Sequence, residues 1–108
     1  MPANLTISGY PFTCVPLADI NFADVAAIYV ILCVAEDGSW TVLDVGQSGE
    51  VGDRLDTHDR KRCWEQCCPN RNIWVCVHPT PSTKYTRQQR MQLESDLRRQ
   101  LAPKCGKR

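Results

Sequence analysis

Two apolar runs rich in β-branched residues stand close together, at Ala27–Ala35 and Trp40–Val45. The four residues between them contain Asp37-Gly38, a strong signal for a hairpin turn. We therefore expect an antiparallel hairpin. A third run of the same kind, Asn72–Val77, is closed by prolines and predicts another strand.

Helical spacing appears between and after these runs. From residue 49 to about residue 67, Val51, Leu55 and Trp64 recur among charged residues, which predicts one amphipathic helix ended by Pro69. A second helix is expected after Thr83 or Thr86, because Thr86 and Gln89 have capping-box spacing. Leu93, Leu97 and Leu101 recur every four residues and form its buried stripe, and Pro103 stops the helix.

These elements predict an α+β fold with a three-stranded, mostly antiparallel sheet flanked by helices, in the order ββαβα. Residues 25–108 are expected to form a single domain, since a chain of 108 residues is too short for two. Residues 1–24 contain three prolines and a glycine, and they read as an irregular N-terminal extension with at most an edge strand.

Charge is distributed unevenly along the chain. All 13 Lys and Arg residues lie at or after Arg54, and seven acids precede it. Residues 1–53 therefore carry −7, while thirteen bases against five acids give residues 54–108 a formal charge of +8. This pattern predicts either a basic surface for a polyanion such as nucleic acid, or two halves that neutralise each other in the fold.

The seven cysteines are odd in number, and neither a signal peptide nor a membrane-length apolar run accompanies them. We expect a soluble protein with free thiols in a reducing compartment, the cytoplasm. A zinc site is the alternative. It is disfavoured because Cys-x2-Cys spacing is absent and adjacent cysteines on a helix point about 100 degrees apart. The residues considered for zinc are Cys63, Cys67, Cys68, Cys76, His58 and His78.

Several chemically informative residues occur in a recognisable order. Ala27-Ile28-Tyr29 lies in the first strand, Asp44-Val45-Gly46-Gln47-Ser48 ends the second, and Arg54 follows Gly46 by eight residues. His58 comes four residues later, and Glu94 opens an E-x2-L-x3-L-x-P pattern. Over about three-quarters of the chain, this arrangement resembles the GIY-YIG nuclease domain.

The resemblance implies a metal-dependent phosphodiesterase that acts on DNA. Tyr29 with His58 would assist deprotonation of the attacking water, and Arg54 would stabilise charge on the phosphate. Glu94 would hold one Mg²⁺ or Mn²⁺ ion. Asp44 replaces the family's second tyrosine, and it is read as a second metal ligand or a proton acceptor.

Two further positions depart from the family pattern: Ala27 replaces a glycine, and Gly106 stands where an asparagine usually follows the last helix. The rival hypothesis is a domain that has lost catalysis and binds nucleic acid or a protein. Glu94 also lies four residues from Arg90 and from Arg98, so an exposed ion-pair ladder is its structural alternative.

DNA is the expected partner, and specificity would come from DNA shape, from a protein partner or from a second copy of the chain. Repair and restriction are both compatible roles. Trp64 and Trp74 are expected in the core rather than stacked on bases. The residues expected to contact nucleic acid are Gln47, Ser48, Lys61, Arg62, Lys84, Arg87 and Arg90.

Overall fold

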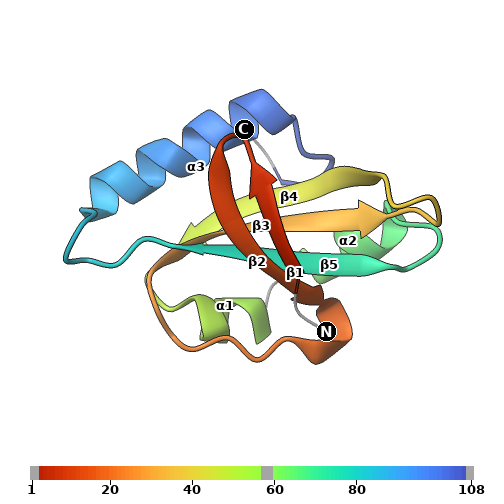
Figure 1. Ribbon diagram of the computed structural model, residues 1–108, viewed down its shortest axis with the longest axis horizontal. Helices are drawn as coiled ribbons and strands as arrows, with labels where there is room; N and C mark the ends of the chain where they lie inside the picture. Colours follow the sequence, from red (N-terminus) through yellow and green to blue (C-terminus); the bar gives the residue numbers. More distant parts are fainter. Residues whose placement is uncertain (1–2, 57–59, 107–108) are drawn as a thin grey trace.

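The computed structural model describes residues 3–56 and 60–106, and Figure 1 shows its arrangement. His58, a predicted catalytic residue, lies outside the described residues. The strands are β1 (Ala3–Ile7), β2 (Tyr10–Pro16), β3 (Ala27–Val34), β4 (Trp40–Ser48) and β5 (Ile73–Pro79). The helices are the 3-10 turn η1 (Leu17–Asp19), α1 (Val51–Asp56), α2 (Lys61–Gln66) and α3 (Arg87–Leu101).

The sheet corrects the predicted architecture. The fold is α+β, but its sheet has five strands in the order β1-β2-β5-β3-β4, with antiparallel neighbours throughout. The prediction of three strands in the order ββαβα is wrong on both counts. The chain instead runs through four strands before α1 and places β5 between α2 and α3.

The two additional strands come from the N-terminal segment that we expected to be irregular. Ser8 and Gly9 both have positive φ, at 53° and 86°, and Ile7 pairs directly with Tyr10. A two-residue turn with two positive φ angles matches the twist of a hairpin. β2 then pairs with β5, so the hairpin extends the sheet.

The predicted hairpin of β3 and β4 is confirmed, with Gly38 at a φ of 89° in its turn. The expected single helix from 49 to 67 is wrong, because α1 and α2 are separate helices. The last helix is confirmed: Thr86 is its N-cap, and the capping box with Gln89 is present. α3 ends before Pro103, at a left-handed Ala102.

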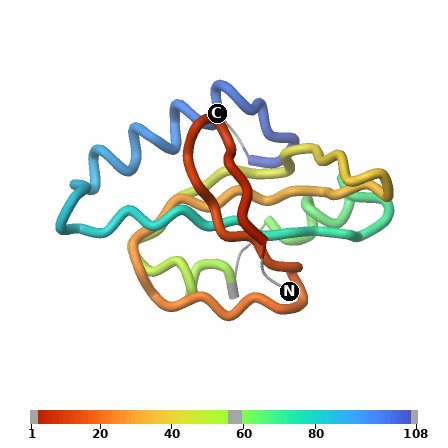
Figure 2. The backbone as a smooth tube through the Cα atoms, in the orientation of Figure 1, coloured from red at the N-terminus to blue at the C-terminus, as the bar shows by residue number. Residues whose placement is uncertain are grey.

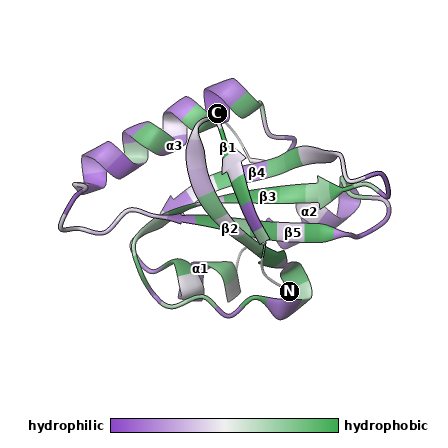
Figure 3. Cartoon of the chain, in the orientation of Figure 1, coloured by the Kyte–Doolittle hydropathy of each residue, from purple (hydrophilic) through white to green (hydrophobic). Residues whose placement is uncertain are grey.

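Two hydrophobic layers lie on opposite faces of the sheet. One includes Tyr29, Leu55 and Trp64 and is covered by α1 and α2. The other includes Val45 and Leu97 and is covered by α3 and the β1–β2 hairpin. Figure 3 shows hydrophobic residues concentrated on β3 and β5, whereas α3 mixes hydrophobic and hydrophilic positions, as expected for a helix with one buried face.

The cysteines correct a further expectation, that of free thiols. Six of the seven form disulfides, and Cys67 is the free cysteine. Such pairing is usual in oxidising compartments, so it argues against the cytoplasmic localisation, which stays a prediction. In the described part of the chain, helices with the length and apolar character needed to cross a membrane are absent. The pairs are Cys14–Cys76, Cys33–Cys68 and Cys63–Cys105.

Candidate functional site

The site begins with the pairing of Tyr29 in β3 and Gly46 in β4. Residues directly opposite each other in a ladder point to the same face, so the tyrosine ring extends over the glycine. A Cβ atom at Gly46 would lie 2.2 Å from both Cζ and Oη of Tyr29. Position 46 must therefore be glycine for the phenol to cross β4.

Burial controls the acidity of this phenol. Removal from water raises the pKa of Tyr29 to about 12, and the nearby Asp44 charge acts in the same direction. The positive charge of Arg54, a hydrogen bond with Arg54 and the charge of Arg60 oppose that shift. Because the pKa stays well above neutrality, Tyr29 is a neutral phenol at pH 7.

Arg54 is positioned by the short helix α1. Val51 and Leu55 on this helix are buried in the core, while Arg54 is half-buried. α1 contacts both β3 and β4. A residue next to a buried anchor is held near the sheet, and this explains why the guanidinium reaches the Tyr29 phenol.

α3 brings Glu94 to the outer edge of β4. Arg90 donates from Nε to Oε1 of Gln47 at 2.8 Å, and Arg98 donates from Nη1 to Oδ1 of Asp44 at 3.1 Å. Residues four apart lie on one helix face, so the half-buried Glu94 lies between these two contacts. It faces the stretch of β4 that contains Gly46.

The sequence allowed an exposed ion-pair ladder of Arg90, Glu94 and Arg98, and the burial of the two arginines corrects that expectation. Arg90 is 7% exposed and Arg98 is 5% exposed, and the contacts of both with β4 exclude a purely solvated face. Tyr29 and Arg54 thus lie together on the sheet face that α1 and α2 cover, and Glu94 lies on α3 between two arginines that contact β4. Tyr29 is 1% exposed, so the groups of this set that a phosphate could reach are the half-buried Arg54 guanidinium and Glu94 carboxylate.

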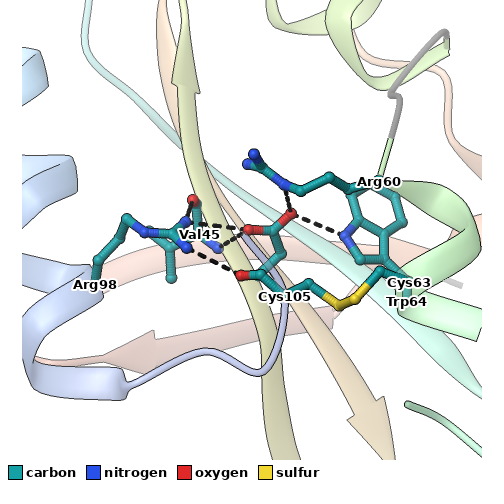
Figure 4. The surroundings of a disulfide bond; sticks show 7 residues. Val45, Arg60, Cys63, Trp64, Arg98 and Cys105 are labelled. Atoms are coloured by element: carbon teal, nitrogen blue, oxygen red, sulfur yellow. Dashed lines mark hydrogen bonds and ion pairs between the residues drawn. A yellow bond between two sulfur atoms is a disulfide. The ribbon is translucent and has the colours of Figure 1, made fainter. Parts of the chain in front are cut away.

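Asp44 has a different environment from the one that we predicted. It is fully buried, and its Oδ2 accepts from Arg60 Nε at 2.7 Å and from Trp64 Nε1 at 2.9 Å. Oδ1 accepts from Arg98 Nη1 and from the Val45 amide. Arg98 also donates to the Val45 carbonyl. Figure 4 shows these partners converging from both sides of β4.

The Asp44 carboxylate therefore has both oxygens engaged by protein donors. It is a buried ion-pair partner in this structure, rather than a solvent-facing metal ligand or proton acceptor. One carboxylate stands against the guanidiniums of Arg60 and Arg98, so the formal charge of the group is +1. We call these three residues with Trp64 the Asp44 cluster.

The C-terminal segment completes this cluster. Figure 2 shows the chain turning after α3 and returning beside β4, where the amide of Cys105 donates to the Leu43 carbonyl at 2.7 Å. Gly106 has a φ of 83°, and a Cβ there would lie 2.5 Å from Nη2 of Arg98 and 3.2 Å from Oδ1 of Asp44. Asp44 and Gly106, which depart from the GIY-YIG pattern 62 positions apart in the sequence, thus meet in one place.

The basic residues predicted to contact DNA fall into two groups, at the starts of α2 and α3. Arg62, Lys84 and Arg87 are exposed, and Lys61 is half-buried. At the end of β4, Gln47 and Ser48 are half-buried, and Gln47 is held by the buried Arg90. Arg90 therefore orders the end of β4, and the exposed bases near it remain the candidate phosphate contacts.

The donors at this edge fit the metal that the resemblance implies. Glu94 supplies one carboxylate at the β4 edge, and one carboxylate with water and phosphate oxygens is ordinary coordination for Mg²⁺. Within residues 3–56 and 60–106, the group of three or more metal-binding side chains that lie close together is Cys63, Cys67 and Cys105. These thiols suit softer ions than Mg²⁺.

Sequence reasoning did not assign Arg60, Trp64 or Arg98 to the site. Trp64 was expected in the core, which its complete burial confirms, but its indole also donates to Asp44. A buried acid in a strand requires donors, and this requirement is a usable signal. It could not identify which of thirteen bases would supply them.

Comparisons with protein-family models, with curated proteins and with solved structures found no match for this chain. The resemblance of residues 27–103 to the GIY-YIG domain rests on sequence motifs and stays a prediction.

Proposed function

We propose that this protein is a divalent-metal-dependent endonuclease that hydrolyses DNA phosphodiester bonds. The observation that carries the proposal is the contact of Arg54 with the Tyr29 phenol over Gly46, with Glu94 on the helix whose arginines contact the same strand. These residues are also the ones that resemble the catalytic set of GIY-YIG nucleases. Position in the fold and resemblance in sequence therefore favour the same site.

The charge of the Asp44 cluster supports this proposal. An additional carboxylate beside a scissile phosphate would repel it, and this is the main physical objection to Asp44 in a nuclease. Here Asp44 is paired with Arg60 and Arg98, so the formal charge of the group is positive. With aspartate at position 44, the Asp44 cluster therefore still carries a positive formal charge, which attracts a polyanion to this edge.

Each residue has a defined role in the proposed reaction. Tyr29 is 1% exposed, and its neutral phenol positions the guanidinium of Arg54 through their hydrogen bond. Arg54 also donates to the phosphate as negative charge develops on its oxygens. Glu94 would hold Mg²⁺ or Mn²⁺, which would polarise the phosphate and stabilise the leaving oxygen.

A second candidate, a nucleic-acid-binding domain without catalysis, is favoured by one specific observation. The residue at the second tyrosine position, Asp44, is enclosed by protein donors and offers no free oxygen to a substrate. On this hypothesis the exposed bases bind the DNA backbone, and the Asp44 cluster only stabilises the fold.

The test is DNA cleavage with Mg²⁺ or Mn²⁺ on duplex, single-stranded, flapped and branched substrates, using wild type and Glu94→Gln. Loss of the carboxylate should reduce the rate roughly a hundredfold or more, since metal stabilisation contributes several kcal/mol. Glu65→Gln is the matched control. Glu65 is exposed on α2 and pairs with Arg71 at 3.4 Å, so its removal should leave cleavage unchanged.

Three outcomes separate the candidates. Cleavage that Glu94→Gln abolishes and Glu65→Gln preserves supports the nuclease. Cleavage that survives Glu94→Gln rejects this assignment of the site. No cleavage with either metal, together with DNA binding that weakens steeply as salt rises, supports the binding domain, because backbone contacts release counterions.

A further inference from the structure

A group of three sulfur atoms lies beside the Asp44 cluster, on the α2 side. The Sγ atoms of Cys63, Cys67 and Cys105 all lie within 4.8 Å of one another. Cys63 and Cys105 form a disulfide, and Cys67 is the free cysteine. Cys63 and Cys67 are four residues apart along the α2 segment, so they present their sulfurs on one side of it.

The spacing of these atoms suits a thiolate metal site. Zn–S bonds of about 2.3 Å place two sulfurs of a tetrahedral site about 3.8 Å apart. The separations that involve Cys67, within 4.8 Å, need to shorten by at most about 1 Å, whereas Cys63 and Cys105, 2.04 Å apart in the disulfide, must separate by about 1.8 Å once that bond is open. Cys67 is half-buried and Cys105 is buried, so the site would be shielded yet reachable from solvent.

The other cysteines explain why this set differs from the one weighed in the sequence. Cys68 points to Cys33 and Cys76 points to Cys14, so neither can join Cys67. The third ligand comes from Cys105, 38 positions after Cys67, which ordinary zinc-motif spacing does not include. Only the return of the C-terminal segment beside β4 brings it there.

We propose that Cys63, Cys67 and Cys105 form a three-thiolate Zn²⁺ site when the Cys63–Cys105 disulfide is reduced. Two thiols of a reductant become one disulfide, and their two electrons and two protons convert the protein disulfide to two thiols. Zn²⁺ then displaces one proton from each of the three cysteines, with water as the fourth ligand. In the reverse step a small-molecule disulfide takes two electrons from the Cys63 and Cys105 thiolates and becomes two thiols, and the reformed Cys63–Cys105 bond removes two ligands and releases the metal.

The disulfide and the zinc-bound form would both attach Cys105 to α2, and this attachment would stabilise the C-terminal segment. The carbonyl of Cys105 accepts from Nη2 of Arg98 at 2.9 Å, and Trp64, next to Cys63, donates to Asp44. Figure 4 shows the Cys63–Cys105 bond beside these partners. A disulfide in oxidising conditions and Zn²⁺ in reducing conditions would each hold the segment in place.

The test is metal binding by the full chain, reduced with a phosphine and then titrated with Co²⁺ and Zn²⁺ without oxygen. One equivalent of Co²⁺ should produce thiolate-to-metal charge-transfer bands and tetrahedral d–d bands, which Zn²⁺ then removes. The variant is Cys67→Ser, which preserves the Cys63–Cys105 pair. The matched control is Cys33→Ser/Cys68→Ser, which removes a disulfide but keeps the three-thiol group.

Wild type and the control should bind one equivalent only when reduced. Cys67→Ser should bind at least about a hundredfold more weakly, since even partners outside the ligand set contribute about 10- to 100-fold. Circular dichroism of each reduced protein verifies that it is folded. The proposal is overturned if folded, reduced wild type binds no stoichiometric Zn²⁺, or if it binds no more tightly than Cys67→Ser.

Discussion

The two outer edges of the sheet are both extended by a neighbouring segment, but different forces hold the two extensions. At one edge the β1–β2 hairpin is attached by the β2–β5 ladder. Ile7 and Phe12 on it are almost fully buried in an apolar layer. A disulfide between Cys14 and Cys76 crosses the same pair of strands.

The β4 edge is held mainly by polar groups. The C-terminal segment makes two backbone hydrogen bonds to β4, from Lys104 to Val42 and from Cys105 to Leu43. It also lies against Arg98, one of the two arginines that pair with the buried Asp44. Here a disulfide, Cys63–Cys105, joins the segment to a helix rather than to a strand.

The difference teaches where specific residues are required. Apolar burial is roughly proportional to area and has no preferred direction, so an edge held this way tolerates exchange of one hydrophobic side chain for another. A buried carboxylate needs donors at particular atoms, and removal of the carboxylate or of its charged partners leaves buried charge poorly compensated. The candidate catalytic residues lie at the edge that has this second character.

The largest expected effect comes from breaking the Asp44 cluster. Asp44→Asn keeps the shape but removes the charge between Arg60 and Arg98, which leaves the buried Arg98 guanidinium and the partly exposed Arg60 guanidinium poorly compensated. We expect the free energy of unfolding to fall by about 3–5 kcal/mol. Urea unfolding of both proteins measures the difference.

Asp96→Asn is the matched control, because Asp96 makes a surface ion pair with Arg99 at 2.8 Å. The same chemical change there should cost less than about 1 kcal/mol. Equal effects at the two positions would contradict the assignment of Asp44 as an essential buried charge.

The sequence predicted those parts of the fold whose signals are local. The β3–β4 hairpin follows from its alternating runs and Asp37-Gly38, and the start of α3 follows from Thr86 and Gln89. The β1–β2 hairpin was missed because prolines in the segment indicated irregular structure. Ser8-Gly9 was a turn signal at that point. Pairing of β2 with β5 depends on contacts across about 60 residues, which local patterns do not contain.

The candidate site was predictable to a similar extent. The order and spacing of residues indicate Tyr29, Arg54 and Glu94 as candidates, and that assignment stays a prediction. The enclosure of Asp44 was not predictable, because its partners come from α2 and α3 and could be any of several arginines. The thiol group was missed for the same reason, since Cys105 reaches it only through the tertiary fold.

The second prediction compares the disulfides at the two edges. Cys14→Ser/Cys76→Ser and Cys63→Ser/Cys105→Ser open loops with sequence separations of 62 and 42 residues. Chain entropy depends weakly on loop length, so each variant should lose a similar amount, about 2–4 kcal/mol under oxidising conditions. Thermal or urea unfolding of the oxidised proteins gives these values.

Amide hydrogen exchange under native conditions distinguishes the two variants. Loss of Cys63–Cys105 should speed exchange at the Cys105 amide, which donates to Leu43. Loss of Cys14–Cys76 should instead speed exchange in the β1–β2 hairpin and leave residue 105 protected. If both variants change exchange at both edges, the edges are one cooperative unit and the comparison between them fails.

The smallest expected effect concerns Tyr29 at high pH. Burial raises its pKa from the ordinary tyrosine value of 10.0 to about 12, so the folded protein retains a proton that the unfolded chain loses between these values. The contribution is fully present below pH 10 and is lost as pH rises through 12, by up to about 2.7 kcal/mol.

Tyr29→Phe lacks this group, so the stability difference between wild type and variant should shift against wild type over that range. Urea unfolding of both proteins at several pH values from about 9 to 12 measures the shift, and because all other titrating groups are shared, their effects cancel to first order. Parallel curves of unfolding free energy against pH would mean that the phenol is solvated. Tyr29 would then not lie enclosed over Gly46, and its contact with Arg54 could not support the proposed site.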